Sequence, residues 1–255
     1  MKYQGGQPKV SRRHHVRESP DGTPPSATDR VYDALRRDIL SCKLPPGTRI
    51  LEGELADHFE VSKTPVKRAL GMLMHEGFVE VRPRHGYRVT EISLADVQEI
   101  YQLRQVVEPA AAELAAANAS PEQLQELRRL VEESTKDSYE QKVDKVLRFH
   151  EILAEASGND RLSAVIGGLM DEMECLLSLG LDIEKSVSVQ ASEHRELLDA
   201  LLKGNHHSAR TIAEHQVEVG RMRMFEAILE SLTGTGGAAD QVVLRPMVAP
   251  PVTKP

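Results

Sequence analysis

The sequence predicts a mainly α-helical protein with two unlike parts: a small N-terminal part of three helices and a β-hairpin, then an antiparallel all-α bundle of about six helices. Apolar residues recur at helical spacing through most of the chain, whereas the alternation typical of strands is confined to residues 78–90. The charge changes near the same boundary. Residues 28–90 carry 11 basic and 9 acidic residues, but residues 91–232 carry 14 and 27, a net charge of −13. This asymmetry suggests that only the front part meets a polyanion.

The composition excludes several classes of protein. No apolar run approaches the roughly 18 residues of a membrane helix, and no apolar segment follows the basic N-terminus as in a secretory signal. Cys42 and Cys175 are isolated, which is typical of reduced thiols in a cytoplasmic protein. Residues 1–27 are basic and rich in Pro, Gly and Ser, and residues 233–255 are rich in Gly, Ala and Pro. We expect both tails to be disordered.

Residues 28–91 are expected to form the small domain. A first helix over about 28–41, capped by Thr28, is followed by a Pro-Pro-Gly turn and a short extended stretch. A second helix over about 52–59 and a two-residue turn lead to a third helix that starts at Ser62. Helix, short turn and helix together predict a helix-turn-helix unit.

The third helix has the features of a DNA-recognition helix. The Ser62 hydroxyl is suited to cap its first turn, and Pro65 falls where a missing N–H costs nothing. Lys63, Lys67 and Arg68 gather in the N-terminal half, where a helix that enters a groove meets phosphates and base edges.

Two alternating segments follow, over 78–81 and 87–90, and predict a hairpin. Its connection, Arg82-Pro83-Arg84-His85-Gly86, is basic and forms a wing beside the recognition helix. Three helices and a wing predict a winged helix.

Residues 92–232 show helical patterns and no convincing strand. The connections are short, so neighbouring helices should pack antiparallel. We place the helices at about 94–118, 121–136, 139–157, 160–180, 185–203 and 205–231.

Three histidines lie on apolar stripes of three different bundle helices, at His150, His194 and His215. Imidazoles on three inward faces can converge on one metal ion, although any one of them alone is more often an ordinary core histidine. Arg104 and Glu108 lie one turn apart on another inward stripe, where a charged pair is costly unless it is paired or bound to a ligand.

Three motifs in the first half of the chain resemble those of a known protein family. Leu-Pro-Pro-Gly-Thr-Arg-Ile at 44–50, Ser-Lys-Thr-Pro-Val at 62–66 and Arg-His-Gly-Tyr-Arg-Val at 84–89 resemble the GntR family of bacterial transcription regulators. The second half resembles the FadR C-terminal (FCD) ligand-binding domain. The residues that carry this second resemblance are Tyr101, Arg104, Glu108, Phe149-His150, Ala156-Ser157-Gly158-Asn159, His194, Ala209 and His215. Six helices rather than seven suggest the vanillate-repressor-like branch.

The resemblance implies a homodimeric repressor that binds an inverted-repeat operator in double-stranded DNA. Lys63, Thr64 and Lys67 stand at the family's recognition-helix contacts, and His85 and Gly86 stand at its wing tip. There are departures: lysines replace the usual arginines, Arg68 replaces a usual Glu, and Gly53 replaces an Arg that often contacts DNA. Since lysine lacks the guanidinium fork that reads guanine, the operator sequence is not inherited with the fold.

The resemblance also implies a small carboxylate effector in the helical domain. Arg104 would bind the carboxylate through two parallel N–H groups, with Glu108 and Tyr101 beside it. The alternative is that Arg104 only forms an ion pair with Glu108 within the helix. The family binds a divalent metal, zinc or similar, at the positions of the three histidines, but Val146 replaces its usual Asp ligand. The alternative is a metal-free pocket in which the histidines bind the effector directly.

Two other function classes remain open from the sequence. A three-histidine metal centre could activate water, as in a metal-dependent hydrolase, but no motif for the accompanying general acid or base is recognisable. The winged helix could instead serve only as a protein-interaction module. We therefore expect a regulator and not an enzyme.

Overall fold

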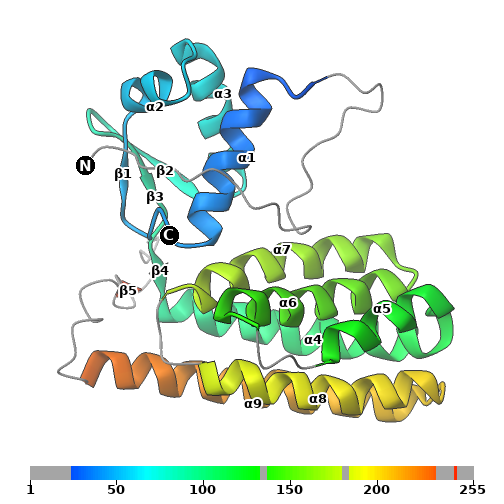
Figure 1. Cartoon of the computed structure of the whole chain (residues 1–255). Coiled ribbons are helices and arrows are strands. Elements are labelled where there is room, and N and C mark those ends of the chain that lie inside the picture. The colour runs from blue at the N-terminus through cyan, green and yellow to red at the C-terminus, as the bar shows by residue number, and fades with distance from the viewer. Residues whose placement is uncertain (1–23, 133–136, 180–183, 234–243, 246–255) are drawn as a thin grey trace, which may run out of the picture. The chain divides into compact units, whose positions relative to one another are not determined.

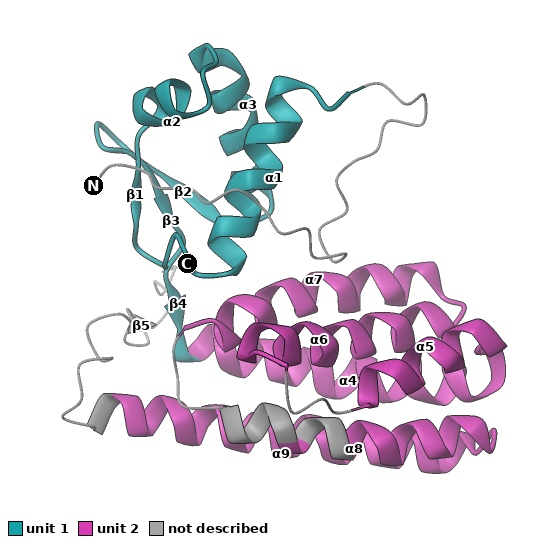
Figure 2. Cartoon of the chain, in the orientation of Figure 1, with its two compact units in different colours: residues 1–94, 240–255 teal, residues 95–239 magenta. Residues whose placement is uncertain are grey.

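The computed structural model describes residues 24–132, 137–179, 184–233 and 244–245 (Figure 1). Almost all of the two tails predicted to be disordered lies outside these residues. The chain divides into two compact units, residues 1–94 with 240–255 and residues 95–239 (Figure 2). The predicted mainly helical fold is confirmed.

The first unit contains the three predicted helices, α1 (Ala27–Leu40), α2 (Glu52–His58) and α3 (Lys63–His75). The predicted caps need correction. Ser26, not Thr28, caps α1: its hydroxyl accepts from the Asp29 N–H, and the Asp29 carboxylate accepts from the Ser26 N–H in return. Ser62 stands at the N-cap of α3 with extended backbone, but its side chain makes no capping hydrogen bond.

The predicted hairpin is present as β2 (Val79–Arg82) and β3 (Gly86–Val89), antiparallel, with Val79 opposite Val89. The extended stretch β1 (Arg49–Ile50) adds to the other edge of β3, so the strand order is β1-β3-β2. Glycine is required at position 86, where β1 lies beside β3. Its φ is +84°, and a Cβ there would lie 2.8 Å from the Ile50 carbonyl oxygen.

The core of the winged helix forms where α1 and α2 pack on α3 and the sheet closes one side (Figure 1). Apolar residues three and four apart on each helix supply it, as the periodicity predicted. Its buried members are Val31, Tyr32, Leu35, Ile39, Ile50, Leu55, Ala56, Val66, Ala69, Leu70, Leu73, Val79 and Val89.

One small sheet departs from the prediction. β4 (Ile92–Ser93) pairs in parallel with β5 (Leu244–Arg245). The expectation of no strand within 92–232 was therefore wrong at its first two residues. The expectation of a wholly disordered C-terminal tail was also wrong, at residues 244–245.

The second unit is the helical bundle, and six helices are described in it, as predicted. α6 packs against α5, α7 and α8, and α8 packs against α9, to which it is joined by a short turn at 203–205 (Figure 1). No helix among the described residues is long and apolar enough to cross a membrane. The helices are α4 (Leu94–Asn118), α5 (Pro121–Val131), α6 (Tyr139–Ala156), α7 (Asp160–Leu177), α8 (Glu184–Leu202) and α9 (His206–Thr233).

Candidate functional site

The side chains expected to contact DNA from the third helix are all solvent-exposed. Lys63, Thr64, Lys67 and Arg68 are exposed on α3, whereas Val66 between them is buried in the core. Because α3 begins at Lys63, these side chains lie in its first two turns. The free N–H groups of a helix N-terminus favour phosphate at the same place.

Lys67 has a neighbour that the sequence did not suggest. Its Nζ lies 3.6 Å from Oε2 of Glu52 on α2, and the lysine side chain is 62% exposed. An exposed pair of this kind contributes little stability, so a DNA phosphate can take the place of Glu52 at small cost.

The wing presents Arg84 and His85 to solvent. Arg84 adopts the left-handed region, with φ of 67°, which makes the tight turn between the two strands. Arg49 braces this turn, because its Nε donates to the His85 carbonyl oxygen at 3.1 Å. Gly86, expected at the DNA-contacting tip, also has a conformational task, because the absence of a Cβ lets β1 approach β3. Sequence reasoning missed Arg49, whose partner is 36 residues away.

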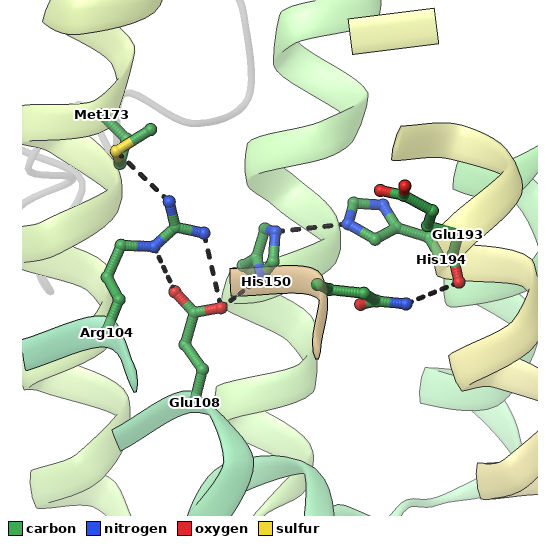
Figure 3. A network of polar contacts seen from close by, with 7 residues as sticks. Arg104, Glu108, His150, Met173, Glu193 and His194 are labelled. Carbon is green, nitrogen blue, oxygen red and sulfur yellow. Dashed lines mark hydrogen bonds and ion pairs between the residues drawn. The ribbon is translucent and has the colours of Figure 1, made fainter. Parts of the chain in front are cut away.

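The second unit encloses a chain of polar side chains drawn from three helices (Figure 3). On α4, Arg104 Nε donates to Glu108 Oε1 at 2.5 Å. Glu108 Oε2 lies 3.0 Å from Nδ1 of His150 on α6, and Nε2 of His150 lies 3.2 Å from Nε2 of His194 on α8. All four residues are at most 7% exposed. We call Arg104, Glu108, His150 and His194 the buried polar network.

The chemistry of the side chains restricts the contacts of the network. A carboxylate can only accept, so any hydrogen bond between Glu108 and His150 needs a proton on Nδ1 of the imidazole. Between the two facing Nε2 atoms, one nitrogen donates and the other accepts.

Burial and neighbouring charges shift the pKa of Glu108 and that of His194. Burial alone would raise the pKa of Glu108, but the Arg104 guanidinium and the His150 ring outweigh it and hold that pKa far below its usual range. For His194, burial is the largest cause and His150 adds to it, so the pKa of this imidazole lies well below its ordinary value of 6.5. At neutral pH Arg104 is therefore a cation, Glu108 an anion and His194 a neutral imidazole.

Two further side chains surround the guanidinium. Tyr101 lies beneath it, with the guanidinium carbon 4.9 Å from the ring centroid, and burial raises the pKa of this phenol. Arg104 Nη1 donates to the sulfur of Met173 on α7 at 3.4 Å (Figure 3). A thioether is a weak acceptor, so the hydrogen bond of Nη1 is the weakest that the guanidinium makes. The three residues predicted to bind an effector, Tyr101, Arg104 and Glu108, therefore lie together.

His215 does not join the network. Its side chain is exposed on α9, so the inward face predicted for it was wrong. The buried face of α9 runs through Ala213 and Val217. Position 215 is two residues from each, about 200° round a helix of 3.6 residues per turn.

The remaining donors do not fit a metal ion. The 3.2 Å between the two Nε2 atoms would suit two ligands of one ion, but zinc sites take three or four protein ligands. Val146 offers no donor and His215 lies outside. Within the described ranges, no group of three His, Cys, Asp or Glu side chains is arranged to hold a metal.

Two glutamines near the site were also missed by sequence reasoning. Gln105 donates through Nε2 to the Glu214 carbonyl, and Gln216 donates to the Glu193 carbonyl. The Oε1 atom of each is buried without a hydrogen-bond partner in the structure. Amides look alike in a sequence whether they are buried or solvated, so nothing in the periodicity singled them out.

Comparison with known proteins decides the family. The model for bacterial regulatory proteins of the gntR family matches residues 27–89, and the FCD domain model matches residues 99–218. An HTH-type transcriptional regulator from an unstable DNA locus of Streptomyces ambofaciens is 33% identical over 183 residues, which cover 71% of this chain and 78% of that protein. This chain belongs to the GntR family.

Other GntR-family proteins agree. The transcriptional repressor RspR of Escherichia coli (strain K12) is 27% identical over 198 residues, which cover 74% of this chain and 86% of RspR. A GntR regulator of Rhodococcus sp. RHA1 has the same fold, with a TM-score of 0.71 at 23% identity over 80% of this chain and 99% of that one. These relatives are DNA-binding transcriptional regulators and not enzymes, as the sequence predicted for this chain.

Proposed function

We propose that this GntR-family regulator is a repressor that binds an inverted-repeat operator as a dimer and responds to a small carboxylate. Support for repression comes from RspR, a similar protein that is named a repressor. The FCD domain implies a small-molecule effector in the helical unit.

The effector proposal rests on one observation: the nitrogens of the Arg104 guanidinium have hydrogen-bond acceptors of unequal strength. Nε faces the Glu108 carboxylate, whereas among the residues that the structure describes Nη1 faces only the Met173 sulfur. A carboxylate oxygen is a much stronger acceptor for a guanidinium than a thioether is. An effector carboxylate would therefore replace Met173 at Nη1, while Glu108 keeps its contact with Nε.

We propose that this recognition needs no metal. Two imidazoles are too few for a zinc site, and each already has a partner within the protein. His150 and His194 would instead stabilise Glu108 and hold Arg104 in place. Elemental analysis of the purified protein should find metal far below one equivalent per chain, and one tightly held equivalent would overturn this part.

Operator release tests the effector proposal. Binding of the full chain to an operator fragment is followed by fluorescence anisotropy while a panel of small mono- and dicarboxylates is added. The variant Arg104→Lys keeps the charge but loses the fork, so it should keep basal DNA binding and lose the response. Arg148→Lys is the matched control, because Arg148 pairs with Glu151 on the outer side of α6 and should respond like the parent protein.

Two results would count against the proposal. If Arg104→Lys responds to the same carboxylate at the same concentration as the parent, Arg104 is not its receptor. If the parent binds the operator only at low salt and shows no preference over unrelated DNA, the regulator has no specific operator in that fragment.

A further inference from the structure

The arginines of the three-stranded sheet and its wing fall into two groups. Arg82 and Arg88 each lie beside a carboxylate that is close to them in the chain, at N–O distances of 2.5 Å and 3.0 Å. Arg49 and Arg84 are exposed, and among the residues that the structure describes neither is paired with a carboxylate. A neighbouring carboxylate cancels much of the attraction of a cation for a second anion. Arg49 and Arg84 are therefore available to an anion from outside the chain.

Arg49 is already held in position by a neutral group. Its Nε donates to the His85 carbonyl oxygen at 3.1 Å, while its backbone lies opposite Arg88 in the ladder between β1 and β3. The side chain therefore runs along the sheet toward the wing turn. A carbonyl oxygen accepts a hydrogen bond but carries no net charge, so the charge of the guanidinium is not neutralised. The N–H groups of both Nη atoms have no acceptor among the described residues.

Charge and position together match a DNA phosphate. The guanidinium of Arg49 meets the wing turn at His85, the residue next to Arg84, so two unpaired cations belong to the same turn. Like charges that are close together favour an anion between them. The planar guanidinium suits a phosphate, because two of its N–H groups can bind two phosphate oxygens in parallel. Since the bond of Nε already orders the side chain, binding has less freedom to remove than for a mobile arginine.

We infer that Arg49 binds a phosphate of the DNA backbone through its Nη atoms while its Nε holds the wing turn in place. The inference deepens the operator binding proposed above and rests on it. It assigns a DNA contact to β1, a strand outside both the recognition helix and the wing turn. A phosphate carries no base sequence, so Arg49 should contribute affinity equally on different duplexes.

Fluorescence anisotropy with two labelled duplexes tests the inference. One is a duplex that the parent protein selects from a random-sequence pool, and the other is an unrelated duplex of equal length. Arg49→Ala should weaken binding about 10-fold on both, and the slope of log affinity against log salt should become shallower by about 0.9 for each chain bound. Arg88→Ala is the matched control, because Arg88 lies opposite Arg49 but is paired with Glu91. It should change the affinity by less than about threefold and leave the slope unchanged.

Arg49→Lys separates the phosphate contact from the hold on the wing turn. An ammonium carries its charge and its donors on a single nitrogen, so it cannot serve the His85 carbonyl and a phosphate from two sides of a planar group. The lysine variant should therefore recover the parental salt slope but bind both duplexes about threefold more weakly than the parent.

Folding is monitored by the melting temperature of each variant, which should match that of the parent because Arg49 is exposed. Parental affinity and slope in Arg49→Ala would overturn the inference, as would an equal loss in Arg88→Ala. Weaker binding of Arg49→Ala with an unchanged slope would also overturn it, since Arg49 would then only brace the wing. A parent that selects no sequence from the pool would contradict the specific operator, while the unrelated duplex would still decide the role of Arg49.

Discussion

Removal of the Glu108 charge should destabilise the helical unit strongly. Glu108→Gln keeps the size of the side chain and an oxygen that can accept from His150, but it removes the negative charge opposite Arg104. Arg104 is 5% exposed, and its guanidinium also contacts the Met173 sulfur and the Tyr101 ring. An unpaired buried charge costs about 3–5 kcal/mol, so we expect a loss of that order in the free energy of unfolding.

Removal of the partner charge should restore most of that loss. In Arg104→Met/Glu108→Gln no charge is left unpaired, and an ion pair replaced by neutral side chains is often close to neutral in stability. The double variant should therefore be more stable than Glu108→Gln alone, with a coupling of about 2 kcal/mol or more. The partly exposed pair Arg148 and Glu151 is the control, and Arg148→Met/Glu151→Gln should show a coupling below about 1 kcal/mol.

Hydrogen exchange in increasing urea is the suitable assay. The chain has two units, so a single global transition would mix them, whereas peptides from α4 and α6 report on the bundle alone. The reasoning fails if the Arg104 and Glu108 changes add independently, or if Glu108→Gln is no more costly than the change at Glu151. Either result would mean that water reaches the pair and screens it.

Three further outcomes are expected. Lys67→Ala should weaken operator binding about 10-fold and reduce its salt dependence in anisotropy titrations, whereas Lys43→Ala should not; equal effects would contradict the placement of α3. The unfolded chain protonates His194 below about pH 6.5 while the folded state does not, so stability should fall as pH drops from there, by at most about 1.4 kcal/mol per pH unit. His194→Gln should flatten that profile in urea titrations at several pH values, and an unchanged slope would refute the assignment. Gly86→Ala should lower the melting temperature of the winged helix, because its Cβ meets the Ile50 oxygen and its φ of +84° costs about 1–3 kcal/mol, while the helical Gly71→Ala should not. Equal melting temperatures for the two variants would show that β1 can move away.

The winged helix was predictable because its determinants are local. The positions of α2, α3 and the hairpin follow from apolar spacing and turn residues, and the exposed Lys63 and Lys67 follow from the face opposite to Val66 and Leu70. The cap of α1 was misplaced by two residues, because Ser26 and Thr28 are both good caps by type. Ser26 has the acidic residue three positions later that completes a capping box, at Asp29.

The polar network was only half predictable. Arg104 and Glu108 lie one turn apart, so their pairing could be anticipated from the chain alone. The contacts of Glu108 with His150, and of His150 with His194, join residues about 40 positions apart and depend on how α4, α6 and α8 pack. His215 shows the limit of face assignment, since a helix with apolar residues at several angles leaves its buried side ambiguous.

The sequence by itself determined the family, the helical elements and the basic surface of α3, because these depend on residue type and short spacing. The tertiary structure alone decided which side chains meet in the bundle. It paired the Arg104 charge within the protein, left Nη1 facing Met173, and turned His215 to solvent. The physical reason is that helix periodicity fixes only the direction of each side chain around the helix axis. Packing against neighbouring helices decides which of these directions are buried.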